Sequence, residues 1–207
     1  MEHCGSSKKP DTFNILVLVS GNGTNLQALI DAEKSGNLGN KKIAAVLSDR
    51  DGVFALERAD AAGIPAFVEK PDKTIFKSER RKEHSNRILA FCKKNQIGLV
   101  VLAGFLSILE GDIIKEYSGK MINLHPSLLP KFGGAGMYGE RVHKAVLESG
   151  ESESGCTIHF VDAGTDTGSI LLQRKVPVLP GDTAESLAER IHKEEHIAMV
   201  EGVRMIK

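Results

Sequence analysis

Short, continuous apolar runs alternate with longer segments of helical periodicity along the first part of the chain. The apolar runs predict strands at 13–20, 42–48, 63–69, 98–105 and 120–125. Runs without polar interruption are typical of strands whose two faces are both covered. The intervening segments predict helices at about 25–35, 52–62 and 79–95. This alternation predicts a mostly parallel sheet with helices on both faces.

After Pro130, a Gly-rich loop precedes the remaining predicted elements. These are a helix near 140–149, strands at 156–162 and 169–178, and a final helix from about Thr183, a preferred N-cap residue. The two strands are expected to extend the sheet in antiparallel fashion. We therefore predict the α/β class, with one Rossmann-like domain over 12–207.

Composition restricts the kinds of binding partner that we expect, but it adds little about the fold. The 207 residues fit one domain, and residues 1–11, which lack an apolar run, are expected to be a disordered extension. Lys plus Arg and Asp plus Glu number 27 each, so no overall charge favours nucleic acid or an anionic membrane. No apolar run approaches the length of a membrane span. We expect small-molecule partners, without nucleic acid or membrane.

Cysteine and histidine spacing argues against a metal or a disulfide framework. Cys4, Cys92 and Cys156 are odd in number and have no C-x-x-C spacing, which fits a reducing, cytoplasmic location. The segment "HKEEH" (192–196) is not the zinc motif H-E-x-x-H, and no third ligand is evident. No metal is expected.

The segment "SGNGTN" (20–25) follows the first predicted strand and opens the first predicted helix. Unshielded N–H groups at such a helix start favour a phosphate, and Thr24 and Asn25 can add side-chain donors. Leu26 replaces the third glycine of the dinucleotide fingerprint, and no Lys-Ser/Thr pair completes a Walker motif. A monophosphate therefore fits better than NAD or ATP, and a tight turn without a ligand is the alternative.

Asn123 and His125 end the last parallel strand on one face, at the edge where open α/β sheets bind ligands. Because buried polar groups need partners, they either satisfy each other or await a ligand. A His can act as a general acid and an Asn amide can donate to an oxyanion. Asp166 could orient His125 and raise its pKa, with Asp162 as a rival. A structural role is favoured for His159.

Glu195 lies within the apolar stripe of the final predicted helix. A carboxylate that faces inward needs a partner, either a substrate amine or hydroxyl or an internal cation. In the polar segment 77–87, most charges are expected to face solvent, although Arg81 could reach an anionic ligand tail.

Five segments resemble, in the same order, the phosphoribosylglycinamide formyltransferases. They are "LVSGNGTNLQALI", "VVLAGFLSIL", "INLHPSLLPK", "HFVDAGTDTG" and "EEHIAMVE", in a resemblance that runs from about Phe13 to the C-terminus. Asn-x-His-Pro-Ser-x-x-Pro marks the wider formyltransferase superfamily, and the S-G-N-G-[ST]-N-L-Q opening narrows it to this family. The resemblance implies transfer of the formyl group of 10-formyltetrahydrofolate to the amine of 5'-phosphoribosylglycinamide, in de novo purine (IMP) biosynthesis.

The resemblance also implies roles for individual residues. The catalytic residues would be Asn123, His125 and Asp166. The ribonucleotide contacts would be Gly23, Thr24, Asn25, His192 and Glu195. The folate contacts would be Arg81, Leu106, Ser107, Ile108, Leu109, Asn123, Asp162, Ala163, Gly164, Thr165 and Asp166. Asn123 would donate to the oxyanion of the tetrahedral intermediate, and His125, kept protonated by Asp166, would pass a proton to N10.

One segment departs from the family, and alternatives stay open. The loop 131–143 is longer than the family's short Gly-x-x-His turn, and His143 is expected near the displaced histidine.

A related folate-dependent formyltransferase or deformylase with another acceptor is the alternative, although such members are expected to carry a further domain. A non-catalytic nucleotide-binding module would explain "SGNGTN" but not the Asn123–His125 pair. A monomer or homodimer is expected.

Overall fold

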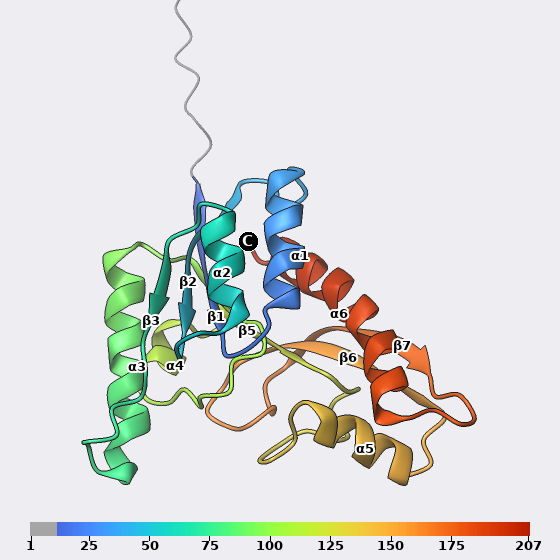
Figure 1. Cartoon of the computed structure of the whole chain (residues 1–207). Helices are drawn as coiled ribbons and strands as arrows, with labels where there is room; N and C mark the ends of the chain where they lie inside the picture. Colours follow the sequence, from blue (N-terminus) through green and yellow to red (C-terminus); the bar gives the residue numbers. More distant parts are fainter. Residues whose placement is uncertain (1–11) are drawn as a thin grey trace, which may run out of the picture.

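The computed structural model describes residues 12–207, so the expectation for residues 1–11 lies outside the described residues. The strands are β1 (Phe13–Val19), β2 (Lys41–Ser48), β3 (Ala66–Val68), β4 (Leu99–Leu102), β5 (Met121–His125), β6 (Glu153–Phe160) and β7 (Ile170–Pro177). The helices are α1 (Thr24–Lys34), α2 (Phe54–Ala61), α3 (Lys77–Lys94), α4 (Asp112–Glu116), α5 (Glu140–Glu148) and α6 (Ala184–Met205) (Figure 1).

The strands form one seven-stranded sheet in the order β3-β2-β1-β4-β5-β6-β7. Strands β1 to β5 pair in parallel, and β6 and β7 extend the sheet in antiparallel fashion. This confirms the predicted fold class. The chain first builds outward from β1 through β2 to β3, and it then crosses through α3 to β4 on the other side of β1. This reversal places a ligand crevice at the carboxyl ends of β1 and β4.

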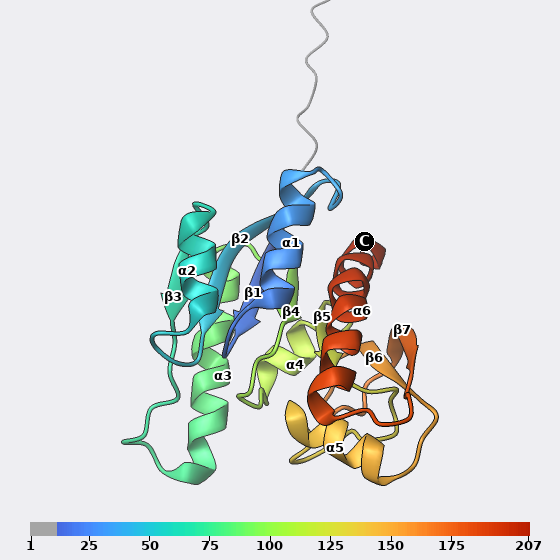
Figure 2. The same cartoon turned by 45° about the vertical axis from the view of Figure 1, so that its right-hand side comes forward.

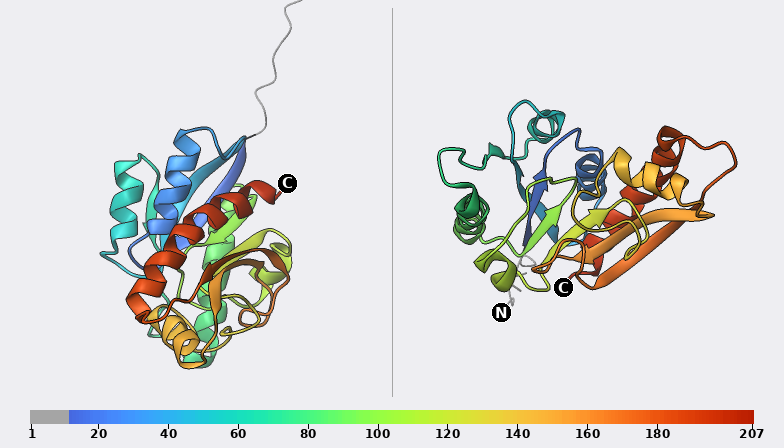
Figure 3. Two further views of the ribbon diagram at one scale, coloured as in Figure 1. Left: turned by 90° about the vertical axis from the view of Figure 1, so that its right-hand side faces the viewer. Right: turned by 90° about the horizontal axis from the view of Figure 1, so that it is seen from below.

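Two apolar layers cover the two faces of the sheet, which explains the uninterrupted apolar strands. In β1, Ile15 and Val17 pack toward the layer that contains α1, α2 and α6. Leu16 and Leu18 pack toward the layer that contains α3 and α4. All four side chains are fully buried. The view from below in Figure 3 separates α1 and α2 from α3 and α4, and Figure 2 shows α6 beside β6 and β7.

Two local predictions were wrong in ways that matter for the site. The apolar run 98–105 was predicted as one strand, but β4 ends at Leu102. Gly104 then takes a φ of 73°, a left-handed conformation that turns the chain out of the sheet. The short helix α4 was not predicted, since five residues carry too little periodicity. The predicted N-cap was confirmed: Thr183 Oγ1 accepts the Ser186 backbone N–H at 3.2 Å.

No helix within residues 12–207 combines the length and the apolar character that a bilayer span requires.

Candidate active site

A cavity of about 610 Å³ lies at the carboxyl ends of β4 and β5, and we call it the main cavity. Its polar wall comes from β5, β6, the loop after β6, α5 and α6. The titratable and amide side chains in that wall include Asn123, His125, His143, His159, Asp166, His192 and Glu195. The sheet therefore brings together polar groups that lie far apart in the sequence.

The structure places Asp166, and not Asp162, beside His125. His125 Nδ1 lies 3.4 Å from Asp166 Oδ2, and the two side chains are 4% and 11% exposed. Asp162 instead accepts the Gly164 backbone N–H at 3.0 Å and the Thr167 hydroxyl at 2.7 Å. It therefore closes the turn that presents Asp166.

Both ring nitrogens of His125 face acceptor oxygens. Nε2 lies 2.8 Å from the carbonyl oxygen of Phe132, and Nδ1 faces Asp166. Either neutral tautomer leaves one nitrogen without a proton toward an acceptor, so this geometry favours the imidazolium. Burial opposes it and lowers the pKa of His125, although Asp166 and the Phe132 carbonyl act in the opposite direction. Asp166 does raise the pKa of His125, as expected, but burial outweighs it, so the pKa lies below its ordinary value.

Asp166 is held by the Gly-rich loop as well as by histidine. Burial disfavours its charged form, but His159, His125 and the backbone N–H of Gly134 together lower the pKa of Asp166. The Gly134 N–H donates to Oδ2 at 3.0 Å. Asp166 has a φ of 58°, a left-handed conformation that Asp tolerates better than most residues. The carboxylate is therefore ionised and fixed in direction.

His159 was expected to be structural, and the structure places it in the main cavity. Its Nε2 lies 3.0 Å from Asn123 Nδ2 and 3.5 Å from Asp166 Oδ1. The antiparallel register pairs Asn123 directly with His159 across β5 and β6. Sequence reasoning missed this contact because it could not fix the register of two strands 36 residues apart. His159 therefore orients the Asn123 amide.

Residues predicted to contact the ribonucleotide gather where α1 approaches α6. Asn25 Nδ2 donates to Glu195 Oε2 at 3.1 Å, and Glu195 is 4% exposed. Burial raises the pKa of Glu195, while His192 and Asn25 favour its charged form. His192 Nε2 lies 3.9 Å from Glu195 Oε2. Within residues 12–207, Asn25 Oδ1 is buried without a hydrogen-bond partner, which leaves an acceptor for a ligand.

His143 lines the same cavity, as the position of the longer loop suggested. It is 3% exposed, and its Nδ1 has no hydrogen-bond partner within the described chain. Burial lowers the pKa of His143 to about 4, with help from His192. The neutral imidazole of His143 thus adds a buried nitrogen, Nδ1, that could form a hydrogen bond with a ligand.

The predicted phosphate turn has the expected backbone geometry but lies outside the wall of the main cavity. Gly23, at a φ of 77°, precedes α1, which begins at Thr24. A Cβ at Gly23 would lie 2.6 Å from the Cβ of Ala55, so this turn requires glycine. The adjacent Asn25–Glu195 hydrogen bond links the turn to the cavity.

The predicted folate segment forms an apolar rim. Leu106 and Ile108 are 48% and 41% exposed and line the main cavity together with Leu109. Of the remaining predicted folate contacts, those in the wall are Arg81, Ser107, Asn123, Asp162, Gly164, Thr165 and Asp166. Ala163 does not line the cavity. Exposed leucine and isoleucine on one wall suit a flat aromatic ligand.

Among residues 12–207, no group of three or more His, Cys, Asp and Glu side chains could hold a metal ion. The expectation that the chemistry needs no metal stays a prediction.

The fold and the site define an α/β protein with an Asn-His-Asp cluster at the carboxyl edge of its sheet. The family model described as "Formyl transferase" matches residues 13–203. Phosphoribosylglycinamide formyltransferase of Escherichia coli is 38% identical over 186 residues, which cover 89% of this chain and 82% of that protein. The chain therefore belongs to the phosphoribosylglycinamide formyltransferases within the formyl transferase family.

Longer relatives and solved structures agree with this assignment. The trifunctional purine biosynthetic protein adenosine-3 of Drosophila melanogaster is 43% identical over 193 residues, which cover 93% of this chain. The chain spans only 14% of that protein. Glycinamide ribonucleotide transformylase 1 from Symbiobacterium toebii has a TM-score of 0.85 at 38% identity, with 97% of this chain and 92% of that chain covered.

Proposed function

We propose that the protein transfers the formyl group of 10-formyltetrahydrofolate to the amine of 5'-phosphoribosylglycinamide, a step of purine (IMP) biosynthesis. The observation that carries the proposal is the shared cavity. Asn123, His125 and Asp166 line one cavity together with the apolar rim 106–109 and with Glu195, which accepts a hydrogen bond from Asn25. The rim suits the folate, Glu195 suits a polar amine, and the reactive groups share the same cavity.

The Asn123 amide supplies the oxyanion contact. The substrate amine attacks the formyl carbon, and the carbonyl oxygen becomes negative. Asn123 Nδ2, oriented by His159 at 3.0 Å, donates to that oxygen. Removing one such donor typically costs about 3–4 kcal/mol of transition-state stabilisation.

His125 and Asp166 move the proton that the reaction must relocate. The attacking amine loses one proton, and N10 of the folate gains one when the carbon–nitrogen bond breaks. Burial lowers the pKa of His125, so the resting imidazole can take up the amine proton, directly or through water. The Asp166 carboxylate, 3.4 Å away, stabilises the imidazolium that forms. The imidazolium then protonates N10.

The wider setting follows from the same proposal. The partners are the two small-molecule substrates, the protein acts in the cytoplasm as a monomer or homodimer, and it needs neither metal nor nucleic acid nor membrane. The related formyltransferases and deformylases differ in the acceptor. An acceptor amine suits Glu195, since a buried carboxylate can receive an ammonium or amine N–H.

A spectrophotometric assay of 10-formyltetrahydrofolate, with and without 5'-phosphoribosylglycinamide, tests the proposal. We expect the folate product to form only when the ribonucleotide is present. Product formation without it would assign a deformylase. Folded protein without turnover, whose melting temperature rises with the ribonucleotide but not with the folate, would assign a nucleotide-binding module.

A further inference from the structure

Three polar side chains lie in one row across β5, β6 and β7, which are neighbours at the antiparallel end of the sheet (Figure 2). His125 of β5 pairs directly with Thr157 of β6, and Thr157 pairs with Gln173 of β7. Directly paired residues of neighbouring antiparallel strands present their side chains on the same face. The row therefore connects His125 to two residues that do not line the main cavity.

Thr157 and Gln173 bind the segment of chain that follows His125. The Thr157 hydroxyl donates to the Ser127 carbonyl oxygen at 2.6 Å and accepts the Leu129 backbone N–H at 3.0 Å. Gln173 Nε2 donates to the Leu129 carbonyl oxygen and to Thr157 Oγ1, both at 2.9 Å. Thr157 is fully buried, so these hydrogen bonds would be costly to leave unmade.

The same segment is closed by Ser127 and leads to Phe132. Ser127 is fully buried, and its Oγ donates to the Lys131 carbonyl oxygen at 2.7 Å. Phe132 then takes a φ of 56°, a left-handed conformation that is rare for a bulky side chain. Backbone strain of this kind persists only where the surrounding contacts over-determine it. The hydrogen bonds of Ser127 and Thr157 supply such contacts.

The strained residue directs its carbonyl group at His125. The Phe132 carbonyl oxygen lies 2.8 Å from His125 Nε2. Two residues further on, the backbone N–H of Gly134 donates to Asp166 Oδ2 at 3.0 Å. The segment 127–134 therefore holds both members of the His125–Asp166 pair.

The Phe132 carbonyl also decides which nitrogen of the resting, neutral ring carries the proton. A carbonyl oxygen can only accept, so the contact at 2.8 Å requires the proton of His125 on Nε2. Nδ1, 3.4 Å from Asp166 Oδ2, then carries the lone pair and is the nitrogen that can take up a proton. Without the carbonyl, the neutral ring could place its proton on Nδ1, toward the carboxylate.

We propose that Thr157 and Gln173 are positioning residues, which hold the segment 127–132 so that the Phe132 carbonyl fixes the orientation and the tautomer of His125. The inference rests on the proposed function, because that function gives His125 the proton transfer. Neither residue lines the main cavity. Their loss should therefore act on kcat through His125 and leave both substrate KM values nearly unchanged.

Formyl-transfer kinetics of single substitutions provide the first test. Thr157→Val keeps the shape of the side chain without its hydroxyl and should lower kcat between about tenfold and about 100-fold, with each KM within about twofold. Gln173→Met, at an exposed position of β7, should lower kcat about threefold, since Thr157 keeps its own hydrogen bonds to the segment. Thr157→Ser retains the hydroxyl and should restore turnover.

Ser154→Ala is the matched control for Thr157→Val. It also removes a buried hydroxyl of β6, but the Ser154 hydroxyl has no hydrogen-bond partner within residues 12–207. Its kcat should stay within about twofold of wild type.

NMR of protein with isotopically labelled histidine ring nitrogens observes His125 without turnover, and His125→Ala identifies its signals. At about pH 8, where the lowered pKa of His125 leaves the ring neutral, the proton should lie on Nε2 in wild-type protein and in Ser154→Ala. Thr157→Val should show a mixture of the two tautomers.

A wild-type ring with its proton on Nδ1 would overturn the inference. So would folded Thr157→Val that loses kcat without a change of tautomer, since this result would assign only a structural role. If Thr157→Val does not fold, Gln173→Met, which leaves the buried hydroxyl in place, decides by the same two measurements. Wild-type protein without turnover refutes the proposed function, and the spectra still decide whether Thr157 and Gln173 position His125.

Discussion

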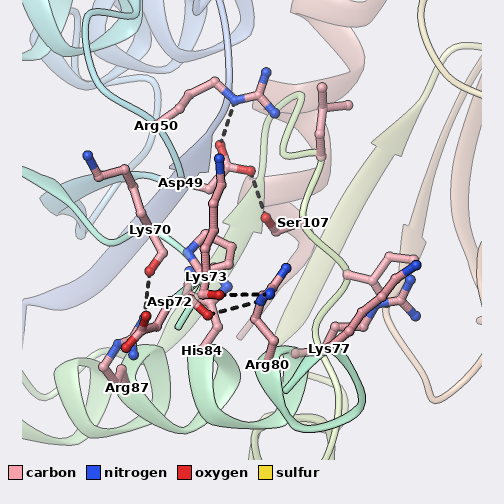
Figure 4. A pocket seen from close by; sticks show the side chains of 14 residues that line it. Asp49, Arg50, Lys70, Asp72, Lys73, Lys77, Arg80, His84, Arg87 and Ser107 are labelled. Carbon is pink, nitrogen blue, oxygen red and sulfur yellow. Dashed lines mark hydrogen bonds and ion pairs between the residues drawn. The ribbon is translucent and has the colours of Figure 1, made fainter. Parts of the chain in front are cut away.

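At Arg81 and the rim 106–108, the main cavity adjoins a second pocket of about 1130 Å³ that seven lysine and arginine side chains line, the basic pocket (Figure 4). The two spaces hold charge in different ways. In the main cavity, His125 and Glu195 are buried, Asp166 is largely buried, and each of the three faces a partner. In the basic pocket, Lys73 and Lys77 are exposed and have no ion-pair partner in the described chain.

This difference separates two tasks. Proton transfer needs desolvated groups whose pKa values respond strongly to one another. Attraction of anions in general needs only exposed charge, which acts over several ångströms and does not fix one geometry. Changes in the main cavity should therefore act on kcat or on a substrate KM by large factors, and changes in the basic pocket should act weakly.

The largest effect is expected from His125→Ala. Loss of the group that moves the proton should lower kcat by roughly 100–10,000-fold while the fold is retained. Measurement of kcat and of the melting temperature separates catalysis from stability. His196→Ala is the matched control, because that half-buried histidine does not line the main cavity. Near-normal turnover of folded His125→Ala would remove His125 from the mechanism.

Acid should lower the stability of the folded protein through His143, which lines the main cavity. Native His143 has a pKa of about 4 and stays neutral, whereas the unfolded chain binds a proton near pH 6.5. Below pH 6.5 the unfolded state holds more protons, so the free energy of unfolding falls as the pH drops from 6.5 toward 4. The share of His143 is about 2–3 kcal/mol. Urea unfolding across this range should show a shallower decline for His143→Gln, and an unchanged slope would contradict the assignment.

Glu195→Gln should raise the ribonucleotide KM about tenfold and leave the folate KM unchanged, because a charge-assisted hydrogen bond becomes a neutral one. The change keeps the shape of the side chain and an acceptor for Asn25. Glu194→Gln is the control, since Glu194 pairs instead with Arg174 at 2.5 Å. Equal effects of the two substitutions would show that charge on α6, and not the buried position, sets the KM.

Much of this architecture could be predicted because single segments determine it. The uninterrupted apolar run of β1 predicts that both faces of the strand are buried. Asn123 and His125 lie two residues apart, so the strand period alone places them on one face. Features that depend on two distant segments could not be predicted in the same way. The β5–β6 register places His159 in the site. The packing of α1 on α6 brings Asn25 within hydrogen-bond distance of Glu195. The charge excess of the basic pocket also arises only when three segments meet.

The Asn25–Glu195 hydrogen bond joins positions 170 residues apart. During synthesis, the predicted phosphate turn emerges early, and its partner helix α6 follows all the other described elements. A nascent chain that has not yet released α6 from the ribosome therefore lacks Glu195, the partner of Asn25. On the proposed function, truncation of α6 before Glu195 is expected to remove ribonucleotide binding.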